Sequence, residues 1–335
     1  MKEVNLAVIG AGFMGSVYAQ ICAELTGTNL IGIVDVDRKL SEKWAKKLET
    51  QAFTDVHDIL RIPELDGVIV STPEDYHTDP VISSANAKKH ILVEKPIAAT
   101  IEDADSMIET AKRNDVKLMV VFNSRFDSKY VVAKDAIEDG KIGEVISVKT
   151  KRNVSIDRPY RLEGRTTPLF YLGVHDFDLM RWLLETEVVR VYAEATRKRL
   201  NEYQVDDTII ATLKFKNGAI GLFETCWVLP KSMPSGFNSD LEIIGTKGVV
   251  RVDSFYQGVT LGNNDGWFYP ATSTFNEIHG RIVGNLELQV AHFVDCIKFD
   301  RNPLISGEDG KKALEIALAI MRSKETGQIV DMPIG

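Results

Sequence analysis

One lysine follows a strand-like run at a place where it could accept a proton. The apolar run His90–Val93 leads into Glu94-Lys95-Pro96, and Pro96 restricts the backbone of Lys95 to an extended conformation. Hydride transfer from an alcohol carbon must be matched by removal of the hydroxyl proton, and a lysine whose pKa is lowered by burial and by nearby cofactor charge can remove it. We expect Lys95 in that role and Glu94 hydrogen-bonded to backbone or ribose, although a Glu-Lys-Pro turn taken alone is more often a solvated loop.

A glycine-rich turn near the start of the chain has the spacing Gly-x-Gly-x-x-Gly. It follows the strand-like run Leu6–Ile9 and opens the helix-like run Gly15–Leu25, which is the context that a dinucleotide site requires. The first glycine allows a tight turn, the second lets backbone N–H groups approach a pyrophosphate, and the third lets helix and strand pack closely. The predicted cofactor-binding residues here are Gly10, Gly12, Phe13, Met14 and Gly15.

A carboxylate follows the second strand-like run. Leu30–Val34 ends at Asp35, which lies about 20 residues after the last glycine, where a carboxylate accepts hydrogen bonds from the adenine ribose. The same negative charge repels a 2′-phosphate, so NAD is favoured over NADP. Arg38 stands close enough to bind such a phosphate, and NADP therefore stays possible.

The third strand-like run contributes a loop to the same edge of the predicted sheet. Gly67–Val70 is followed by Ser71, Thr72 and Pro73, and ligands lie at the carboxyl ends of strands in a doubly wound sheet. We expect the loop Ser71–Thr78 to line the cofactor site. His77 has two interpretations, a loop residue near the nicotinamide ribose or the first residue of a surface helix.

A histidine and a polar loop in the second half could bind a substrate. His175 precedes Asp178 by three residues on one helix face, so it is either a substrate ligand oriented by Asp178 or a satisfied histidine at a helix N-terminus. Its combination with a candidate lysine favours the first interpretation. In the polar loop 152–167, Arg152 and Asp157 are the better candidates for substrate binding.

The order of these segments predicts two domains. Up to Asn123, short apolar runs alternate with amphipathic helical ones, which predicts an α/β domain with a doubly wound parallel Rossmann sheet over residues 1–123. Residues 124–335 contain longer alternating strands, among them Ile209–Phe215 and Ala219–Val228 around Asn217-Gly218, the strongest hairpin signal in the chain. We expect there an α/β domain with a large open, mainly antiparallel sheet.

Composition excludes several classes of protein. The chain of 335 residues has a formal net charge of −8, which argues against nucleic-acid binding. No apolar stretch approaches the length of a membrane helix. The three scattered cysteines fit free thiols in the cytoplasm. Because no His, Cys or Glu cluster has metal-ligand spacing, we predict no metal.

Taken together, these motifs resemble the Gfo/Idh/MocA oxidoreductases, over essentially the whole chain. The glycine turn is unspecific alone, but Glu94-Lys95-Pro96 combined with the later run Gly173–Asp178 is fairly specific. The resemblance implies an NAD(P)-dependent enzyme that oxidises a secondary alcohol of a sugar, cyclitol or related polyol, or catalyses the reverse reduction. Lys95 matches the family's catalytic lysine, and His175 matches the histidine that binds the reacting hydroxyl. Asn123 and Arg125 match the segment that joins the domains beside the cofactor.

One position departs from the family pattern. Tyr171 stands four residues before His175, where many sugar and inositol members have an aspartate. A phenol keeps its proton at neutral pH, so Tyr171 is expected to donate a hydrogen bond to the substrate or relay a proton. The departure weakens the inositol dehydrogenase interpretation but not the resemblance to the broader family. Two alternatives stay open on the same scaffold, a redox glycosidase that stores hydride on NAD and a non-catalytic NAD- or sugar-binding regulator. The resemblance also implies a homodimer or homotetramer formed through the open sheet.

Overall fold

The computed structural model describes residues 3–334, which form two compact units. The first unit contains the described residues up to Phe126 together with Ser273–Leu314, and the second contains Asp127–Thr272 and the chain from Glu315 onward. The boundary after Phe126 is close to the domain boundary expected after residue 123. The return of Ser273–Leu314 to the first unit differs from the simple division into 1–123 and 124–335. It arises from non-local packing, such as the hydrogen bond from Gln289 Nε2 to the Val120 carbonyl (3.2 Å).

The first unit is built on a six-stranded sheet in the order β3-β2-β1-β4-β5-β6. Its strands are β1 Val4–Ile9, β2 Thr28–Val34, β3 Gln51–Phe53, β4 Gly67–Val70, β5 His90–Val93 and β6 Leu118–Val120. Every neighbouring pair is parallel. β1, β4 and β5 are almost wholly buried and apolar, as expected for a parallel sheet covered on both faces. The predicted Rossmann sheet is confirmed.

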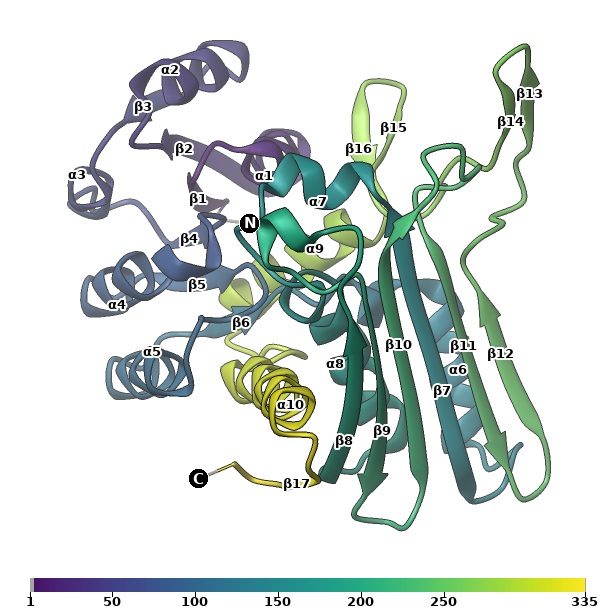
Figure 1. Ribbon diagram of the computed structural model, residues 1–335. Coiled ribbons are helices and arrows are strands. Elements are labelled where there is room, and N and C mark those ends of the chain that lie inside the picture. Colours follow the sequence, from purple (N-terminus) through teal and green to yellow (C-terminus); the bar gives the residue numbers. More distant parts are fainter. Residues whose placement is uncertain (1–2, 335) are drawn as a thin grey trace. The chain divides into compact units, whose positions relative to one another are not determined.

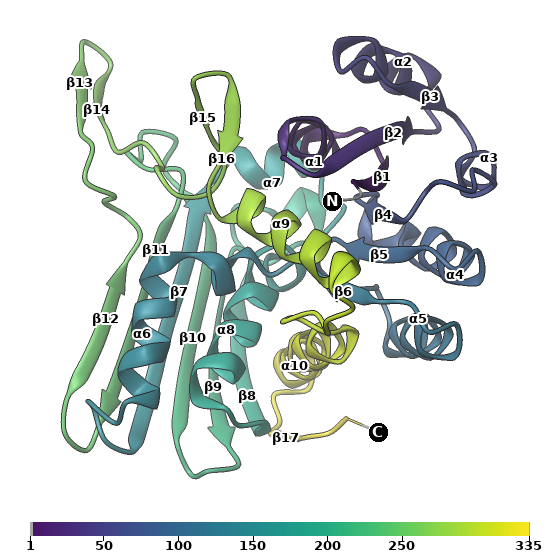
Figure 2. The same cartoon turned by 180° about the vertical axis from the view of Figure 1, so that it is seen from behind.

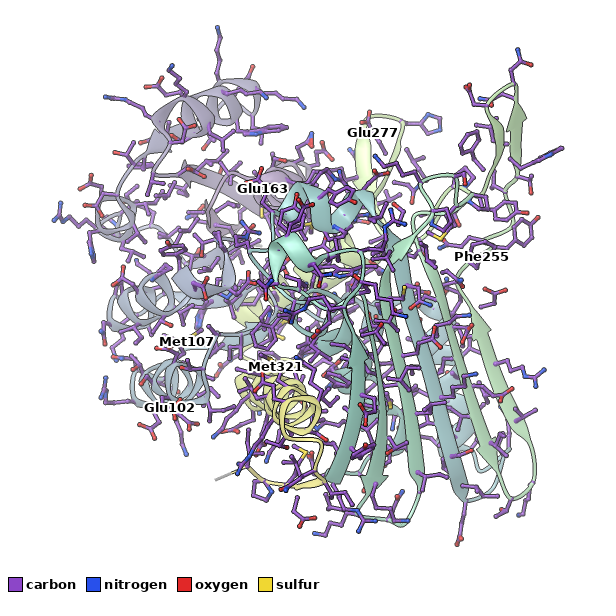
Figure 3. All side chains as sticks on the ribbon, in the orientation of Figure 1. Glu102, Met107, Glu163, Phe255, Glu277 and Met321 are labelled. Atoms are coloured by element: carbon purple, nitrogen blue, oxygen red, sulfur yellow. The ribbon has the colours of Figure 1, made fainter. Side chains whose placement is uncertain are left out.

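Helices lie on both faces of this sheet (Figure 1). They are α1 Phe13–Glu24, α2 Arg38–Lys47, α3 Val56–Leu60, α4 Thr78–Asn86, α5 Ile101–Arg113, α9 Asn285–Lys298 and the first part of α10 Gly307–Thr326. Short additions are the 3-10 turns η1 Glu74–Tyr76 and η2 Asn123–Phe126 and the hairpin β15 Asn276–Ile278 with β16 Arg281–Val283. α5 shows the amphipathic pattern, since Met107 is buried and Glu102 is exposed (Figure 3).

The second unit is built on a seven-stranded sheet in the order β12-β11-β7-β10-β9-β8-β17. Its strands are β7 Val145–Ser155, β8 Val188–Thr196, β9 Thr208–Phe215, β10 Ile220–Leu229, β11 Asn238–Gly245, β12 Val249–Asp253 and β17 Val330–Asp331. The predicted hairpin is confirmed: β9 and β10 are antiparallel, and Gly218 has the positive φ (94°) that the turn requires. Only β7 and β10 pair in parallel among the described strands of this sheet.

Helices α6 Ser128–Glu138 and α8 Val174–Leu184 cover one face of this sheet. The unit also contains α7 Asp157–Leu162, the π-helical turn η3 Leu169–Gly173, the 3-10 turn η4 Asn201–Tyr203 and the rest of α10. The short hairpin β13 Leu261–Asn263 with β14 Gly266–Phe268 follows β12. α6 and α8 lie behind the long strands in Figure 1 and in front of them in Figure 2. The rings of Phe177 on α8 and Phe223 on β10, 4.7 Å apart, join helix to sheet. Within residues 3–334, none of the helices has the length and apolar character of a membrane span.

Candidate active site

The first loops of the parallel sheet begin side by side at its carboxyl edge. Gly10 donates its N–H to the last residue of β2 (2.8 Å), Ser71 donates to the last residue of β1 (2.8 Å), and Glu94 donates to the last residue of β4 (2.9 Å). The sheet hydrogen bonds therefore continue for one residue past the strands. The sequence-predicted cofactor residues after β1, β4 and β5 are thereby brought together at one edge.

The glycine turn has the geometry that a dinucleotide phosphate needs. Gly10 has a φ of 94°, and a Cβ there would lie 2.7 Å from the Ser71 carbonyl oxygen. A Cβ on Gly15 would lie 1.7 Å from the Gly10 oxygen, whereas one on Gly12 would meet nothing within 4 Å. Gly12 caps α1 without a side-chain hydrogen bond, and the first turn of α1 contains no acidic residue. The helix N-terminus beside Gly12 is therefore open to an anion.

Asp35 directly follows β2 and contacts the glycine turn. Its Oδ2 accepts a hydrogen bond from the Ala11 N–H (2.7 Å) and its Oδ1 accepts one from the Asp37 N–H (2.8 Å). Each carboxylate oxygen has a further lone pair for a ribose hydroxyl. Ser71 Oγ is buried and has no hydrogen-bond partner among residues 3–334, so it also offers a polar group at this edge. These residues fit a bound NAD.

Arg38, the other residue considered for cofactor binding here, is paired with a neighbouring carboxylate. Its Nε lies 2.9 Å from Glu42 Oε1, one turn along α2, and its side chain is 80% exposed. An ion pair this exposed is weak, and only Nε takes part in it. The preference for NAD therefore rests on the Asp35 carboxylate and not on Arg38.

His77 lies inside the protein, with an exposed fraction of 1%. Its Nδ1 is 3.1 Å from the carbonyl oxygens of both Pro96 and Ile97, and its Nε2 is 2.9 Å from that of Thr72. The ring thus joins the loop after β4 to the turn after β5. His77 is also the N-cap residue of α4, as the second sequence interpretation expected, but its side chain is buried and not at the surface. Pro73 ends the loop's extended part and precedes the turn η1.

Lys95 begins a turn that the structure holds through Glu94. The Glu94 carboxylate is buried; its Oε2 accepts the Lys95 N–H (3.0 Å) and its Oε1 accepts the Tyr18 hydroxyl (2.6 Å). Burial, followed by the Glu94 charge, raises the pKa of Tyr18 well above its usual value, so the phenol remains a donor. Tyr18 was not foreseen from the sequence.

Asn123 and Arg125 are bound by the returning segment of the first unit. Asn123 Nδ2 donates to Asn285 Oδ1 (3.2 Å). Arg125 is buried and donates to the Leu304 carbonyl and to Asp309 Oδ1, both at 3.1 Å. Their expected contact with the cofactor stays a prediction, and their observed contacts connect η2 to the starts of α9 and α10.

The helix of His175 is anchored by a buried ion pair in the second unit. His175 is half-buried on α8, and it follows a π-helical turn rather than standing at a free helix N-terminus. Its neighbour Asp176 is buried, and Asp176 Oδ2 lies 2.7 Å from Arg152 Nε on β7. Burial alone would lower the pKa of Arg152, but the Asp176 and Tyr130 side chains offset this and raise it. Arg152, expected to bind substrate, is thus engaged in holding α8 to the sheet.

Tyr171 lies one helical turn before His175, in the π-helical turn. Arg158 Nη1 on α7 donates to Tyr171 Oη (3.3 Å), and the tyrosine ring packs 6.4 Å from that of the fully buried Trp227. Asp157, the other expected substrate residue, is paired with Lys231 (2.9 Å), and both side chains are partly exposed. π-helical turns are frequent at functional sites.

The sequence prediction missed Tyr18, Arg158 and the role of Asp176. Tyr18 and Glu94 are far apart in the chain, and Arg158 occurs among several arginines of one polar loop, so no spacing signal singles them out. Over residues 3–334, no group of three or more His, Cys, Asp or Glu side chains is arranged to hold a metal ion.

Comparison with known proteins places this chain in a family. Residues 4–122 match the family model described as "Oxidoreductase family, NAD-binding Rossmann fold", and residues 134–332 match the one described as "Oxidoreductase family, C-terminal alpha/beta domain". Among curated proteins, the chain is 29% identical to a myo-inositol 2-dehydrogenase of Thermotoga maritima, with 98% of both chains covered. It is 27% identical to a scyllo-inositol 2-dehydrogenase (NAD(+)) of Bacillus subtilis, with 99% of this chain and 97% of the relative covered.

Solved structures agree with these relatives. The structure of a probable dehydrogenase from Thermotoga maritima superposes with a TM-score of 0.84 at 27% identity and covers 98% of both chains. The two family models together span nearly the whole chain and match each half in the expected order. The chain belongs to the Gfo/Idh/MocA family of oxidoreductases and uses NAD as its cofactor.

Proposed function

We propose that this oxidoreductase interconverts a secondary alcohol of a cyclitol or related polyhydroxy compound with the corresponding ketone. The observation that carries the proposal is the position of Lys95, which directly follows Glu94 at the carboxyl edge of β5, where the glycine turn and Ser71 also lie. The names of the curated relatives, a myo-inositol and a scyllo-inositol dehydrogenase, support the cyclitol class.

The residues divide the chemistry between them. NAD, when bound, supplies the acceptor for the hydride. Lys95 takes the proton from the reacting hydroxyl, and His175 hydrogen-bonds that hydroxyl. Tyr171, which Arg158 contacts, donates a hydrogen bond to the substrate in place of the carboxylate that many family members have. Arg152 acts through Asp176 to hold the helix of His175.

A substrate screen tests this function. Purified enzyme is incubated with NAD or NADP and with cyclitols, aldoses, sugar acids or aryl glycosides, while absorbance at the NADH wavelength and release of the aglycone are both followed. We expect net NADH from at least one cyclitol or related polyol. Glycoside cleavage without net NADH, or no turnover of any alcohol in either direction, would contradict the proposal.

The open face of the large sheet supports an assembly of identical chains. On β7, the open face is the side opposite its buried residues. The residues paired with that side of β7 on the neighbouring strands belong to the same face. One end of the open face carries Glu194, Glu224, Asp240 and Asp253 together with Lys151 and Ile210. The other end carries Arg190, Lys214, Ile220, Ile244 and Val249 together with Ser147.

This pattern favours a face-to-face homodimer, which could pair again into a homotetramer. Ile220, Ile244 and Val249 are 55%, 41% and 52% exposed, and such a row of apolar side chains is unusual on an uncovered surface. A second copy with its strands running in the opposite direction would set its acidic end against this basic and apolar end. We expect Ile220→Glu to lower the molar mass measured by light scattering, whereas Val132→Glu, at an exposed position on α6, should not. A wild-type monomer, or an unchanged mass in Ile220→Glu, would contradict this assembly.

We also propose a cytoplasmic location. The three cysteines, Cys22, Cys226 and Cys296, are free and buried. Unpaired thiols are typical of proteins in a reducing compartment. The oxidation state of these three cysteines, measured after gentle lysis under thiol-blocking conditions, tests the proposed location. An intermolecular disulfide in the isolated enzyme would contradict it.

A further inference from the structure

The turn that carries Lys95 is held from the side of helix α1. We call residues Glu94–Ile97 the lysine turn. Tyr18, one turn into α1 from the glycine motif and 1% exposed, donates its hydroxyl to Glu94 Oε1 at 2.6 Å. The other oxygen of the same carboxylate accepts the Lys95 N–H at 3.0 Å. A single buried carboxylate therefore connects the helix that faces the cofactor phosphates to the backbone of the lysine.

The lysine turn is held from its other side by His77. The imidazole Nδ1 lies 3.1 Å from the carbonyl oxygens of both Pro96 and Ile97, directly after the lysine. Its Nε2 lies 2.9 Å from the Thr72 carbonyl oxygen, in the loop after β4. Carbonyl oxygens only accept hydrogen bonds and a neutral imidazole carries one N–H, so the tautomer decides which of these contacts is a hydrogen bond. In either tautomer the ring lies between the two loops and contacts both. With 1% of its surface exposed, the ring has these neighbours rather than solvent or a ligand beside it.

We propose that Tyr18 and His77 are positioning residues for Lys95. Together they fix the backbone on both sides of the lysine, Tyr18 through Glu94 and His77 through the carbonyls of Pro96 and Ile97. They act on the direction of the lysine amine and take no part in proton transfer. This inference rests on the proposed function, because the direction of the amine matters only if Lys95 is the proton acceptor.

The physical reason is the steep dependence of proton transfer on geometry. A base must lie within hydrogen-bond distance of the proton that it removes. A shift of the lysine turn by about 1 Å, caused by a change far from the reacting atoms, can cost about a hundredfold in rate. Loss of a phenol hydroxyl leaves the buried Glu94 carboxylate without its 2.6 Å donor, and the carboxylate must then find a new partner or move. Either response changes the support of the Lys95 N–H.

The test compares Tyr18→Phe and His77→Asn with a matched control, Thr28→Val. Thr28 is buried at the other end of α1, where its hydroxyl donates to the Cys22 and Leu25 carbonyls at 2.7 Å. The control therefore also removes a buried hydroxyl from the first unit but lies away from the lysine turn. For each protein we would measure kcat, the KM for NAD, NADH affinity by fluorescence, the melting temperature, and hydrogen exchange of the Lys95 amide.

We expect Tyr18→Phe and His77→Asn each to lower kcat by about ten- to a hundredfold, with NADH affinity and the KM for NAD unchanged. The hydrogen of the Lys95 amide should exchange faster in both variants. Thr28→Val should have a lower melting temperature than the wild-type enzyme but the same kcat and the same exchange rate of the Lys95 amide. In a Lys95→Ala background the two substitutions should cause no further loss of rate. A kcat no lower than that of Thr28→Val, or the same fold loss in the Lys95→Ala background, would overturn the inference.

Failure of the proposed function would be distinguishable from failure of this inference. If the wild-type enzyme oxidises no alcohol, the function is wrong. The positioning is then judged by hydrogen exchange and by the rate at which an acylating reagent labels the Lys95 amine, measured by mass spectrometry with NADH bound. Faster amide exchange and faster labelling of Lys95 in both variants would still show that Tyr18 and His77 position the lysine turn. Unchanged values in both variants would refute it.

Discussion

Replacing Asp35 by serine should weaken NADH binding and relax the preference against NADPH. The carboxylate lies at the glycine turn, where Oδ2 accepts the Ala11 N–H at 2.7 Å and keeps lone pairs for the ribose hydroxyls. A hydrogen bond to a charged group contributes about 1.5–3 kcal/mol, so loss of one ribose contact should raise the Kd of NADH about ten- to a hundredfold. Removal of the negative charge should at the same time tighten NADPH binding, because a 2′-phosphate is no longer repelled.

Fluorescence titration of NADH and NADPH measures both effects without any substrate. Asp35→Asn separates the charge from the hydrogen bond, since its amide oxygen can still accept the Ala11 N–H. Asp37→Ser is the matched control: Asp37 caps α2 by accepting the Lys39 N–H at 2.9 Å, and serine caps a helix about as well. An unchanged ratio of NADH to NADPH affinity in Asp35→Ser, or an equal loss in Asp37→Ser, would refute the assignment of Asp35.

Three further predictions concern the second unit and the core of the first. Arg152→Met should lower the free energy of unfolding, measured in urea, by about 3–5 kcal/mol, because it leaves the Asp176 carboxylate buried and unpaired. A loss of stability as small as that caused by Arg61→Met, which breaks an exposed ion pair, would contradict this. Tyr171→Phe should lower kcat/KM for the substrate by up to about tenfold, because one neutral hydrogen bond is lost; an unchanged kcat/KM would remove the hydroxyl from the substrate site. Burial raises the pKa of the Cys22 thiol from 9.0 to about 12, so the folded state keeps a proton that the unfolded state releases. The free energy of unfolding should therefore fall between pH 9 and pH 12, by at most about 1.4 kcal/mol per pH unit. Urea unfolding of Cys22→Ala should show a shallower fall, and an equal slope would be evidence against this cause.

The parallel sheet could be predicted from local patterns because its buried strands are short, continuous apolar runs. β4 and β5 begin and end at the predicted residues. β3, Gln51–Phe53, was missed because it is a short edge strand whose residues are mostly exposed. The return of Ser273–Leu314 to the first unit could not be predicted, since it depends on contacts such as Gln289 with Val120, which leave no periodic signal.

The candidate site divides in the same way. The glycine turn and Asp35 follow the fixed spacing of a dinucleotide-binding motif, and the structure puts them in hydrogen-bond contact through Ala11. The two buried contacts that hold the functional side chains follow no such motif; Tyr18 and Glu94 are 76 positions apart, and Arg152 and Asp176 are 24 apart. A pattern search treats each partner as an isolated polar residue in an apolar run. Such pairs become visible only when the strands and helices are placed in three dimensions.

The kinetics of Lys95→Ala test the proposed chemistry most directly. NADH affinity and kcat would be measured side by side, with the substrate that the screen identifies. If Lys95 removes the proton, NADH should bind as it does to the wild-type enzyme while kcat falls by about 10²- to 10⁴-fold, the usual contribution of a positioned general base. A variant that binds NADH and turns over at the wild-type rate would show that the proton leaves by another route.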